Sequence, residues 1–138
     1  MCILIQQPKG HTFSNFWLKD FYKGNADGIG VMYAENGKLV VKKALPKSQE
    51  ELIEFYRAHV QGKECFIHLR MRTHGDINLE QCHPYEIFGE ESDYPLYLMH
   101  NGVLKSGNAA DTSKSDTWHY IKNIIRPALA ADPTQFTS

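Results

Sequence analysis

The side chain in this sequence best suited to covalent chemistry is Cys2, which directly follows Met1. Removal of Met1 would leave a thiol and a free α-amine on the same residue. The ordinary pKa is about 7.7–8.0 for an α-amine and about 8.5 for a thiol, so this amine can accept the thiol proton near neutral pH. Cys2 is therefore a candidate N-terminal nucleophile without a histidine base. Residues 1–5 alone favour a plainer interpretation, a small residue that opens an apolar strand.

Three later polar clusters could supply the rest of a site. Arg70 follows an apolar stretch, and an arginine there can hold a carboxylate bidentately. The amide of Asn101 and the backbone N–H of Gly102 can converge on one oxygen, as an oxyanion site requires. Asp116 could bind an ammonium group or simply favour the start of a helix. Each cluster alone also fits an ordinary turn or surface charge, but together they match an α-amino acid with a side-chain carbonyl, such as glutamine.

The order of these motifs resembles the glutaminase domain of the class II glutamine amidotransferases, whose nucleophile is an N-terminal cysteine. That family has a cysteine after the initiator methionine, then motifs similar to H-T-R-W-A-T-H-G, N-A-H-P, H-N-G and S-D-T. The matching segments here are Cys2 and residues 68–75 (HLRMRTHG), 81–84 (QCHP), 100–102 (HNG) and 115–117 (SDT). Each motif is weak singly, but five in the same order across residues 2–117 are specific.

The resemblance implies a role for each matching residue. The catalytic group would be Cys2 as nucleophile, with the Asn101 side chain and the Gly102 N–H as the oxyanion hole. The substrate-binding group would be Arg70 for the α-carboxylate, Asp116 for the α-ammonium, and Thr73 and His74 lining the pocket. The implied reaction is attack of the thiolate on the side-chain amide of glutamine, loss of ammonia, and hydrolysis of a γ-glutamyl thioester. No metal or cofactor is implied, and the ammonia would pass to an acceptor on a partner synthase.

The sequence also departs from the family pattern in three places. Ile3 stands where the family has glycine after the nucleophile, Gly24 where it has arginine, and Met71 where it has tryptophan. The segment around Gly24 nevertheless keeps Asp27, Gly28 and Gly30 of the family motif. Short, phage-type members show such variation, and this chain resembles them more than the large synthases.

The elements that must position these groups follow from the spacing of apolar residues. Strands are predicted at 2–6, 31–34, 39–44, 65–69 and 96–99, with a hairpin at Asn36-Gly37. Helices are predicted at 12–23, where Phe13, Phe16, Trp17 and Phe21 form a stripe expected in the core, and from the capping box at Ser48 to Gly62. A last helix begins at Ser115, and Pro127 should end or kink it. Residues 70–93 are polar and rich in turns.

The fold implied by the resemblance is α+β, a four-layer αββα N-terminal-nucleophile hydrolase sandwich with antiparallel sheets. Residues 1–138 would form one glutaminase domain. Family domains are usually longer, so the chain is interpreted as either a minimal or a C-terminally truncated version. A truncated sheet would leave an unpaired edge and exposed apolar surface.

Composition limits the other possibilities. A net charge of −1 and a pI near 6.6 argue against nucleic-acid binding, and no apolar run is long enough for a membrane span. Three cysteines favour the reducing cytoplasm over a disulfide framework. Two alternatives remain: an N-terminal-nucleophile hydrolase acting on another amide, and a non-enzymatic metal or interaction module. The metal alternative would use His68, His74, Cys82, His83 and His100, whose spacings match no standard zinc finger.

Overall fold

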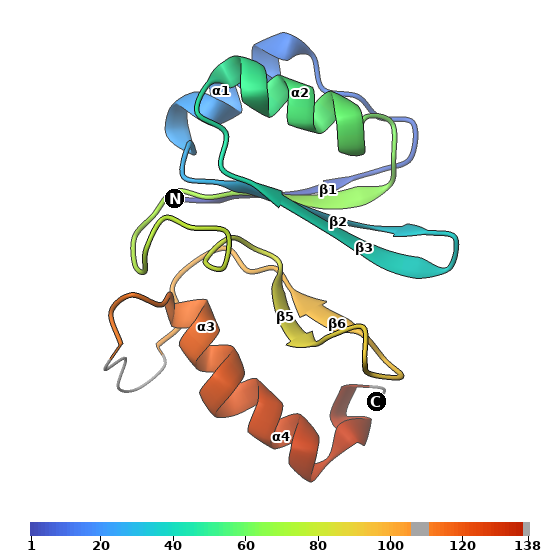
Figure 1. The fold of residues 1–138 in the computed structure, drawn as a ribbon, viewed down its shortest axis with the longest axis vertical. Helices are drawn as coiled ribbons and strands as arrows, with labels where there is room; N and C mark the ends of the chain where they lie inside the picture. Colours follow the sequence, from blue (N-terminus) through green and yellow to red (C-terminus); the bar gives the residue numbers. More distant parts are fainter. Residues whose placement is uncertain (106–110, 137–138) are drawn as a thin grey trace.

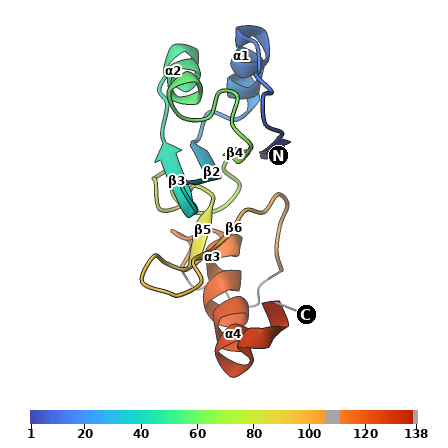
Figure 2. The ribbon, with the colours of Figure 1, turned by 90° about the vertical axis from the view of Figure 1, so that its right-hand side faces the viewer.

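The computed structural model describes residues 1–105 and 111–136, so residues 106–110 and 137–138 of the predicted domain lie outside the described part. Four layers follow one another in Figure 1. Helices α1 (Asn15–Gly24) and α2 (Gln49–His59) cover a four-stranded sheet, a two-stranded sheet lies beneath it, and the helical segment that begins with α3 (Asp116–Tyr120) lies lowest. The side view in Figure 2 has the same order of layers. The α+β class with antiparallel sheets is therefore confirmed.

The larger sheet contains β1 (Ile3–Gln7), β2 (Ile29–Glu35), β3 (Lys38–Ala44) and β4 (Cys65–Leu69), in the order β1-β4-β2-β3. All three pairings are antiparallel. The β2–β3 hairpin turns at Asn36 and Gly37, which both have positive φ (52° and 73°), so this prediction is confirmed. In the β1–β4 ladder Ile3 pairs with Leu69. This register brings Cys2 to the point where the chain leaves β4 for Arg70.

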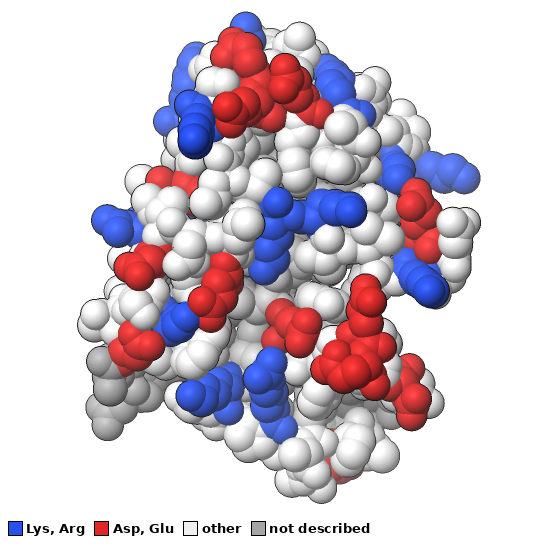
Figure 3. Space-filling view, viewed as in Figure 1, with Lys and Arg blue, Asp and Glu red and all other residues white. Residues whose placement is uncertain are grey.

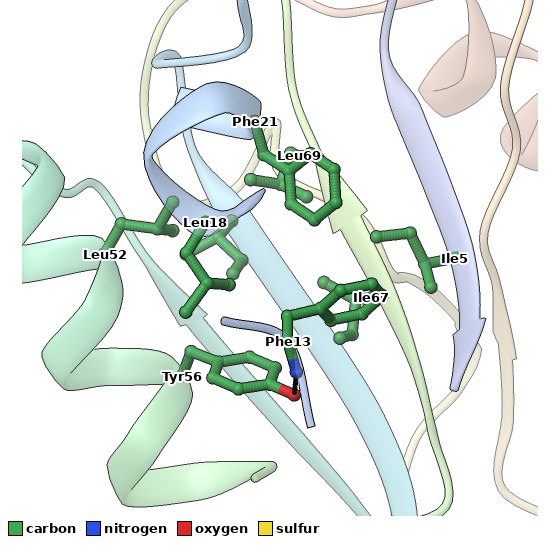
Figure 4. Close-up of a pocket in the computed structure, with 9 residues that line it drawn as sticks. Ile5, Phe13, Leu18, Phe21, Leu52, Tyr56, Ile67 and Leu69 are labelled. Atoms are coloured by element: carbon green, nitrogen blue, oxygen red, sulfur yellow. Dashed lines mark hydrogen bonds between the residues drawn. The ribbon is translucent and has the colours of Figure 1, made fainter. Parts of the chain in front are cut away.

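One face of this sheet packs against α1 and α2. The inward side chains alternate along each strand, and the buried ones include Ile29, Val31, Ile67 and Leu69. Tyr56 of α2 lies in this core, and Figure 4 shows its hydroxyl bonded to the backbone nitrogen of Phe13. Its hydroxyl accepts the Phe13 N–H (3.0 Å) and donates to Oε1 of the fully buried Gln7 (2.6 Å). The core thus closes around one satisfied polar network.

The predicted aromatic stripe on α1 is only half correct. Phe13 and Phe21 are partly buried against the core, but Phe16 is 71% exposed and Trp17 is 51% exposed. The reason is that α1 begins at Asn15, three residues later than predicted, so Phe13 precedes the helix. The face toward the sheet then centres on Leu18, the one buried residue of this helix.

The lower layers are built around a second core. Strands β5 (Tyr85–Phe88) and β6 (Leu96–Leu98) pair antiparallel, and β5 lies in the segment expected to be polar turns. Burial of Tyr85 and Ile87 on either side of exposed Glu86 explains why a strand forms there. Together with Ile121 and Leu129, these residues form a cluster separate from the core above.

The last helical segment begins at the predicted cap, where the Ser115 hydroxyl accepts the Trp118 N–H (3.2 Å). It continues from α3 through a π-helical turn, η1 (Ile121–Ile125), into α4 (Arg126–Ala131), and a 3₁₀ turn follows at η2 (Pro133–Phe136). Pro127 was predicted to end or kink the helix, and the helical segment continues past it. Pro127 lies in the first turn of α4, and the π turn directly precedes this turn.

The two sheets meet closely at one end and loosely at the other. At the close end, β2 presents Gly30 to the backbone of His83. At the loose end, a hollow of about 480 Å³ is lined mainly by apolar side chains, among them Met32, Phe66 and Leu96. The surface in Figure 3 has basic and acidic side chains interspersed on the face it displays. In the part of the chain that the structure describes, no helix combines the length and apolar content of a membrane span.

Candidate functional site

A small cavity at the close end of the two sheets gathers residues from five separate segments. Its volume is about 30 Å³, room for roughly two water molecules. The lining includes six of the seven residues predicted from sequence: Cys2, Arg70, Thr73, His74, Gly102 and Asp116. The seventh, Asn101, donates from Nδ2 to the Cys2 carbonyl oxygen (3.0 Å). All seven therefore lie together, although residues 2 and 116 are at opposite ends of the chain.

Cys2 is half-buried just before β1. Its Sγ accepts the Met71 N–H (3.4 Å) and lies at the same distance from the Met71 carbonyl oxygen, to which the thiol can donate. Met1 is 85% exposed, and its ammonium group contacts Met71 Sδ (2.8 Å). While Met1 is attached, the Cys2 nitrogen is part of a peptide bond and cannot act as a base.

Arg70 is held in place by the loop that follows it. The side chain is 4% exposed, and its guanidinium donates to the carbonyl oxygens of Asp76 (2.6 Å) and His74 (2.9 Å). No carboxylate among the described residues forms an ion pair with it. A buried cation without an anion is costly, and an anionic ligand in the cavity would offset that cost.

Asp116 presents the opposite charge to the same cavity. The half-buried carboxylate accepts the backbone N–H of Leu104 on Oδ2 (2.5 Å) and of Thr117 on Oδ1 (2.9 Å). These bonds fix its orientation and leave further lone pairs free. Within residues 1–105 and 111–136, no cationic side chain pairs with Asp116. One cavity thus has a positive group, Arg70, and a negative group, Asp116, neither of which forms an ion pair within the described part of the chain.

Residues 27–30, which match a motif described above, hold the chain around Arg70 in place through hydrogen bonds. The Arg70 N–H donates to the Gly28 carbonyl oxygen (2.8 Å), and the Asp27 N–H donates to the Arg70 carbonyl oxygen (3.1 Å). The Asp27 carboxylate also accepts the Arg72 N–H (2.7 Å). Asp27 therefore orders the chain around Arg70, whereas Gly24, at the family's arginine position, has open space around it.

A buried network in the wall of the cavity was not predicted from sequence. The Gln81 side-chain oxygen accepts the Ser115 N–H (2.6 Å), and the Tyr85 and Ser115 hydroxyls share a hydrogen bond (2.6 Å). Burial raises the pKa of Tyr85 to about 12, so its hydroxyl stays protonated at neutral pH. Nε2 of Gln81 is buried and has no partner within the described residues. The motif at 81–84 marks this segment, but its contacts with Ser115 depend on the fold.

His68, His83 and His100 form a second group, of which His83 and His100 also line the cavity. The rings of His68 and His83 stack with centroids 4.1 Å apart, and Nδ1 of His83 accepts the His100 N–H (3.1 Å). Desolvation lowers the pKa of His68 to about 4 and that of His83 to about 2, so both rings are neutral at pH 7. In the described ranges, no group of three histidine, cysteine or acidic side chains is arranged to hold a metal ion, and the five residues of the metal alternative form no such group.

These buried histidines predict a stability that falls with acid. The folded-state pKa of His68 (about 4) lies below its ordinary 6.5, so the unfolded chain binds more protons between these values. Stability is then complete above pH 6.5 and is lost as pH falls toward 4. We expect His68 to account for a loss of roughly 2 kcal/mol in unfolding free energy between pH 7 and pH 5. Urea unfolding of wild type and His68→Gln at both pH values measures it, with His11→Gln, an exposed histidine, as control. An equal pH dependence in wild type and His68→Gln would contradict this assignment.

Comparison with known proteins finds a relative that is similar to part of this chain. The chain is 31% identical over 85 residues to glutamine–fructose-6-phosphate aminotransferase [isomerizing] of Aquifex aeolicus (strain VF5). The match covers 62% of this chain and 14% of that protein, so the chain spans about a seventh of the length of the relative. No family model matches the chain, and no solved structure matches it. The chain is thus similar, at a distance, to part of an aminotransferase whose name includes glutamine.

Proposed function

We propose that this protein hydrolyses the side-chain amide of glutamine, with Cys2 as nucleophile, and releases glutamate and ammonia. The observation that carries the proposal is that Arg70 and Asp116, which form no ion pair with any described residue, line one cavity with the Cys2 thiol. A zwitterionic amino-acid headgroup has one charge for each of them. The relative's name, which includes glutamine, supports the same substrate.

Substrate recognition divides between the two charged groups. The α-carboxylate would take the remaining donors of the Arg70 guanidinium, which is already oriented by the carbonyl oxygens of His74 and Asp76. The α-ammonium would take the free lone pairs of Asp116. Thr73 and His74 lie on the exposed loop at the rim of the cavity and would line the bound substrate.

The chemistry would proceed from the free N-terminus of Cys2. The α-amine takes the thiol proton, the thiolate attacks the amide carbon, and the tetrahedral oxyanion is stabilised by the Asn101 amide and the Gly102 N–H. The amine returns the proton to the departing ammonia, and water then hydrolyses the thioester. Asn101 is already beside Cys2, because its amide donates to the Cys2 carbonyl oxygen, and one N–H of that amide remains for the oxyanion.

The order of the layers supports the finer fold assignment as part of this proposal. Helices, a four-stranded sheet, a two-stranded sheet and helices succeed one another, as in an αββα sandwich of the N-terminal-nucleophile type (Figure 1). The residues assigned to chemistry lie where the two sheets meet. We further infer that the ammonia passes to an acceptor on a partner enzyme. A reducing cytoplasm fits the three free cysteines.

The direct test compares two preparations of the same chain. One has Cys2 as its first residue and the other retains Met1, each verified by intact mass. We expect glutamine to give equal amounts of glutamate and ammonia with the first preparation and none with the second, because only the first has a free α-amine. Equal activity with Met1 retained, or inactivity of the processed chain, would contradict the mechanism.

The same assay separates glutamine from other amides. Two analogues, one lacking the α-carboxylate and one lacking the α-amine, should each have a much higher KM, because each leaves either Arg70 or Asp116 without its partner charge. Turnover of both analogues at the rate of glutamine would favour the alternative, a hydrolase acting on a different amide.

A further inference from the structure

We propose that His83 is a positioning residue for the oxyanion donors: Nδ1 of its ring holds the backbone of His100 and so fixes the turn that carries Asn101 and Gly102. This inference rests on the proposed function and gives a new role to a residue that the sequence offered only as a possible metal ligand. His83 and His100 both line the cavity that contains Cys2.

Two hydrogen bonds anchor this turn in the described residues. The His100 N–H donates to Nδ1 of His83 (3.1 Å), and the Asn101 amide donates to the Cys2 carbonyl oxygen (3.0 Å). The first bond lies one residue before Asn101 and two before Gly102. Rotation of the chain at His100 would therefore move both oxyanion donors away from Cys2. Gly102 has a φ of 130°. Because a glycine backbone is conformationally permissive, the local sequence alone does little to fix this turn.

His83 is itself held rigidly. It is buried, its ring stacks on His68 (4.1 Å between centroids, 30° between planes), and Tyr85 meets it edge-on (4.7 Å). Its carbonyl group packs directly against Gly30 of the central strand β2. Because Nδ1 accepts a hydrogen bond, the ring proton is on Nε2, and the lowered pKa keeps this neutral form at physiological pH. The surrounding residues thus hold Nδ1 of His83 in a fixed position.

Such a residue should affect the rate more than the binding. Negative charge on the substrate oxygen develops only in the transition state, so donors aimed at it stabilise that state and not the bound amide. Donors must lie about 2.7–3.1 Å from the oxyanion, so a small displacement of the turn weakens both. Arg70 and Asp116, which would set substrate affinity, make no hydrogen bond with His83 among those that the structure describes.

Two substitutions test the hydrogen-bond acceptor and the aromatic ring of His83 separately. His83→Asn keeps an acceptor close to the position of Nδ1 but removes the stacked ring. His83→Phe keeps a ring of similar shape on His68 but removes the acceptor. With processed protein, we expect His83→Phe to lower kcat by roughly 10- to 100-fold with little change in KM, and His83→Asn to retain most of the wild-type kcat.

A second measurement does not depend on turnover. A hydrogen bond to His83 should slow exchange of the His100 amide with solvent, so NMR hydrogen exchange at that one amide tests the contact. We expect faster exchange in His83→Phe and near-wild-type exchange in His83→Asn. Thermal unfolding of both variants checks that each is folded.

The outcomes are distinguishable from a failure of the proposed function. Wild-type kcat in His83→Phe, or an equal loss of kcat in both variants, would overturn the positioning role. So would unchanged exchange of the His100 amide in His83→Phe. An inactive processed wild type overturns the glutaminase proposal and the catalytic part of this inference, whereas the exchange result still decides whether His83 holds the turn.

Discussion

Replacement of Cys2 by alanine is expected to lower glutamine hydrolysis by about four orders of magnitude or more, because the thioester route is lost with the thiol. The fold should tolerate the change. Cys2 lies before the first residue of β1, and its Sγ makes only long contacts with Met71. The measurement is kcat/KM for glutamine with processed protein, together with the midpoint of urea unfolding.

A matched control is Cys65→Ala. Cys65 is buried in the upper core, and desolvation raises the pKa of its thiol to about 11, so it is not a nucleophile at neutral pH. We expect this variant to lose stability but keep its activity. An electrophilic glutamine analogue should label Cys2 alone in the wild type, since burial also raises the pKa of the Cys82 thiol. Substantial turnover by Cys2→Ala, or labelling of Cys82 in place of Cys2, would rule out the proposed nucleophile.

Replacement of Gly30 by alanine is expected to destabilise the protein by roughly 3–5 kcal/mol. A Cβ on Gly30 would overlap the His83 carbonyl oxygen and lie 2.6 Å from its carbonyl carbon, and both are backbone atoms. Neither the His83 backbone nor strand β2 can easily move to make room. β2 is paired with β3 on one edge and with β4 on the other, so a shift of Gly30 would strain two ladders. Urea unfolding monitored by circular dichroism measures the loss.

Gly24→Ala is the matched control for this substitution. An added Cβ at Gly24 meets nothing within 4 Å, and its backbone is not in the positive-φ region. Its unfolding free energy should stay within about 0.5 kcal/mol of wild type. If Gly30→Ala unfolded at the same urea concentration as Gly24→Ala, the close approach of β2 and His83 would not exist in solution.

Features that depend on a few neighbouring residues were predicted well from sequence. The turn at Asn36-Gly37 is specified by two residues that tolerate positive φ, and the caps at Ser48 and Ser115 by hydroxyls that reach the N–H three residues later. The face that a helix buries is not local in this sense. Phe16 and Trp17 have helical spacing, but the position of the sheet under α1 decides that Leu18 is buried instead.

The same distinction applies to the candidate site. Six of the seven residues taken from the motifs line one cavity, and Asn101 contacts Cys2 beside it. They meet because the β1–β4 register brings Cys2 to Arg70, and the lower layers bring residues 100–102 and 115–117 to both. Gln81 received no role from sequence, and His83 only that of a possible metal ligand, because their contacts with Ser115 and His100 depend on the fold. Strand β5 was missed because its alternation covers only four residues between polar turns.

The two separate hydrophobic clusters affect how the molecule would unfold. One cluster lies between α1, α2 and the large sheet, and the other lies between β5, β6 and the last helices. Close to the cavity, the seam between them is formed by Gly30, His68 and His83. Cys2 and Arg70 belong to the upper half, and Gly102 and Asp116 to the lower half. The cavity is therefore an interface within one chain, and opening along that seam would dismantle it while each half kept its own core.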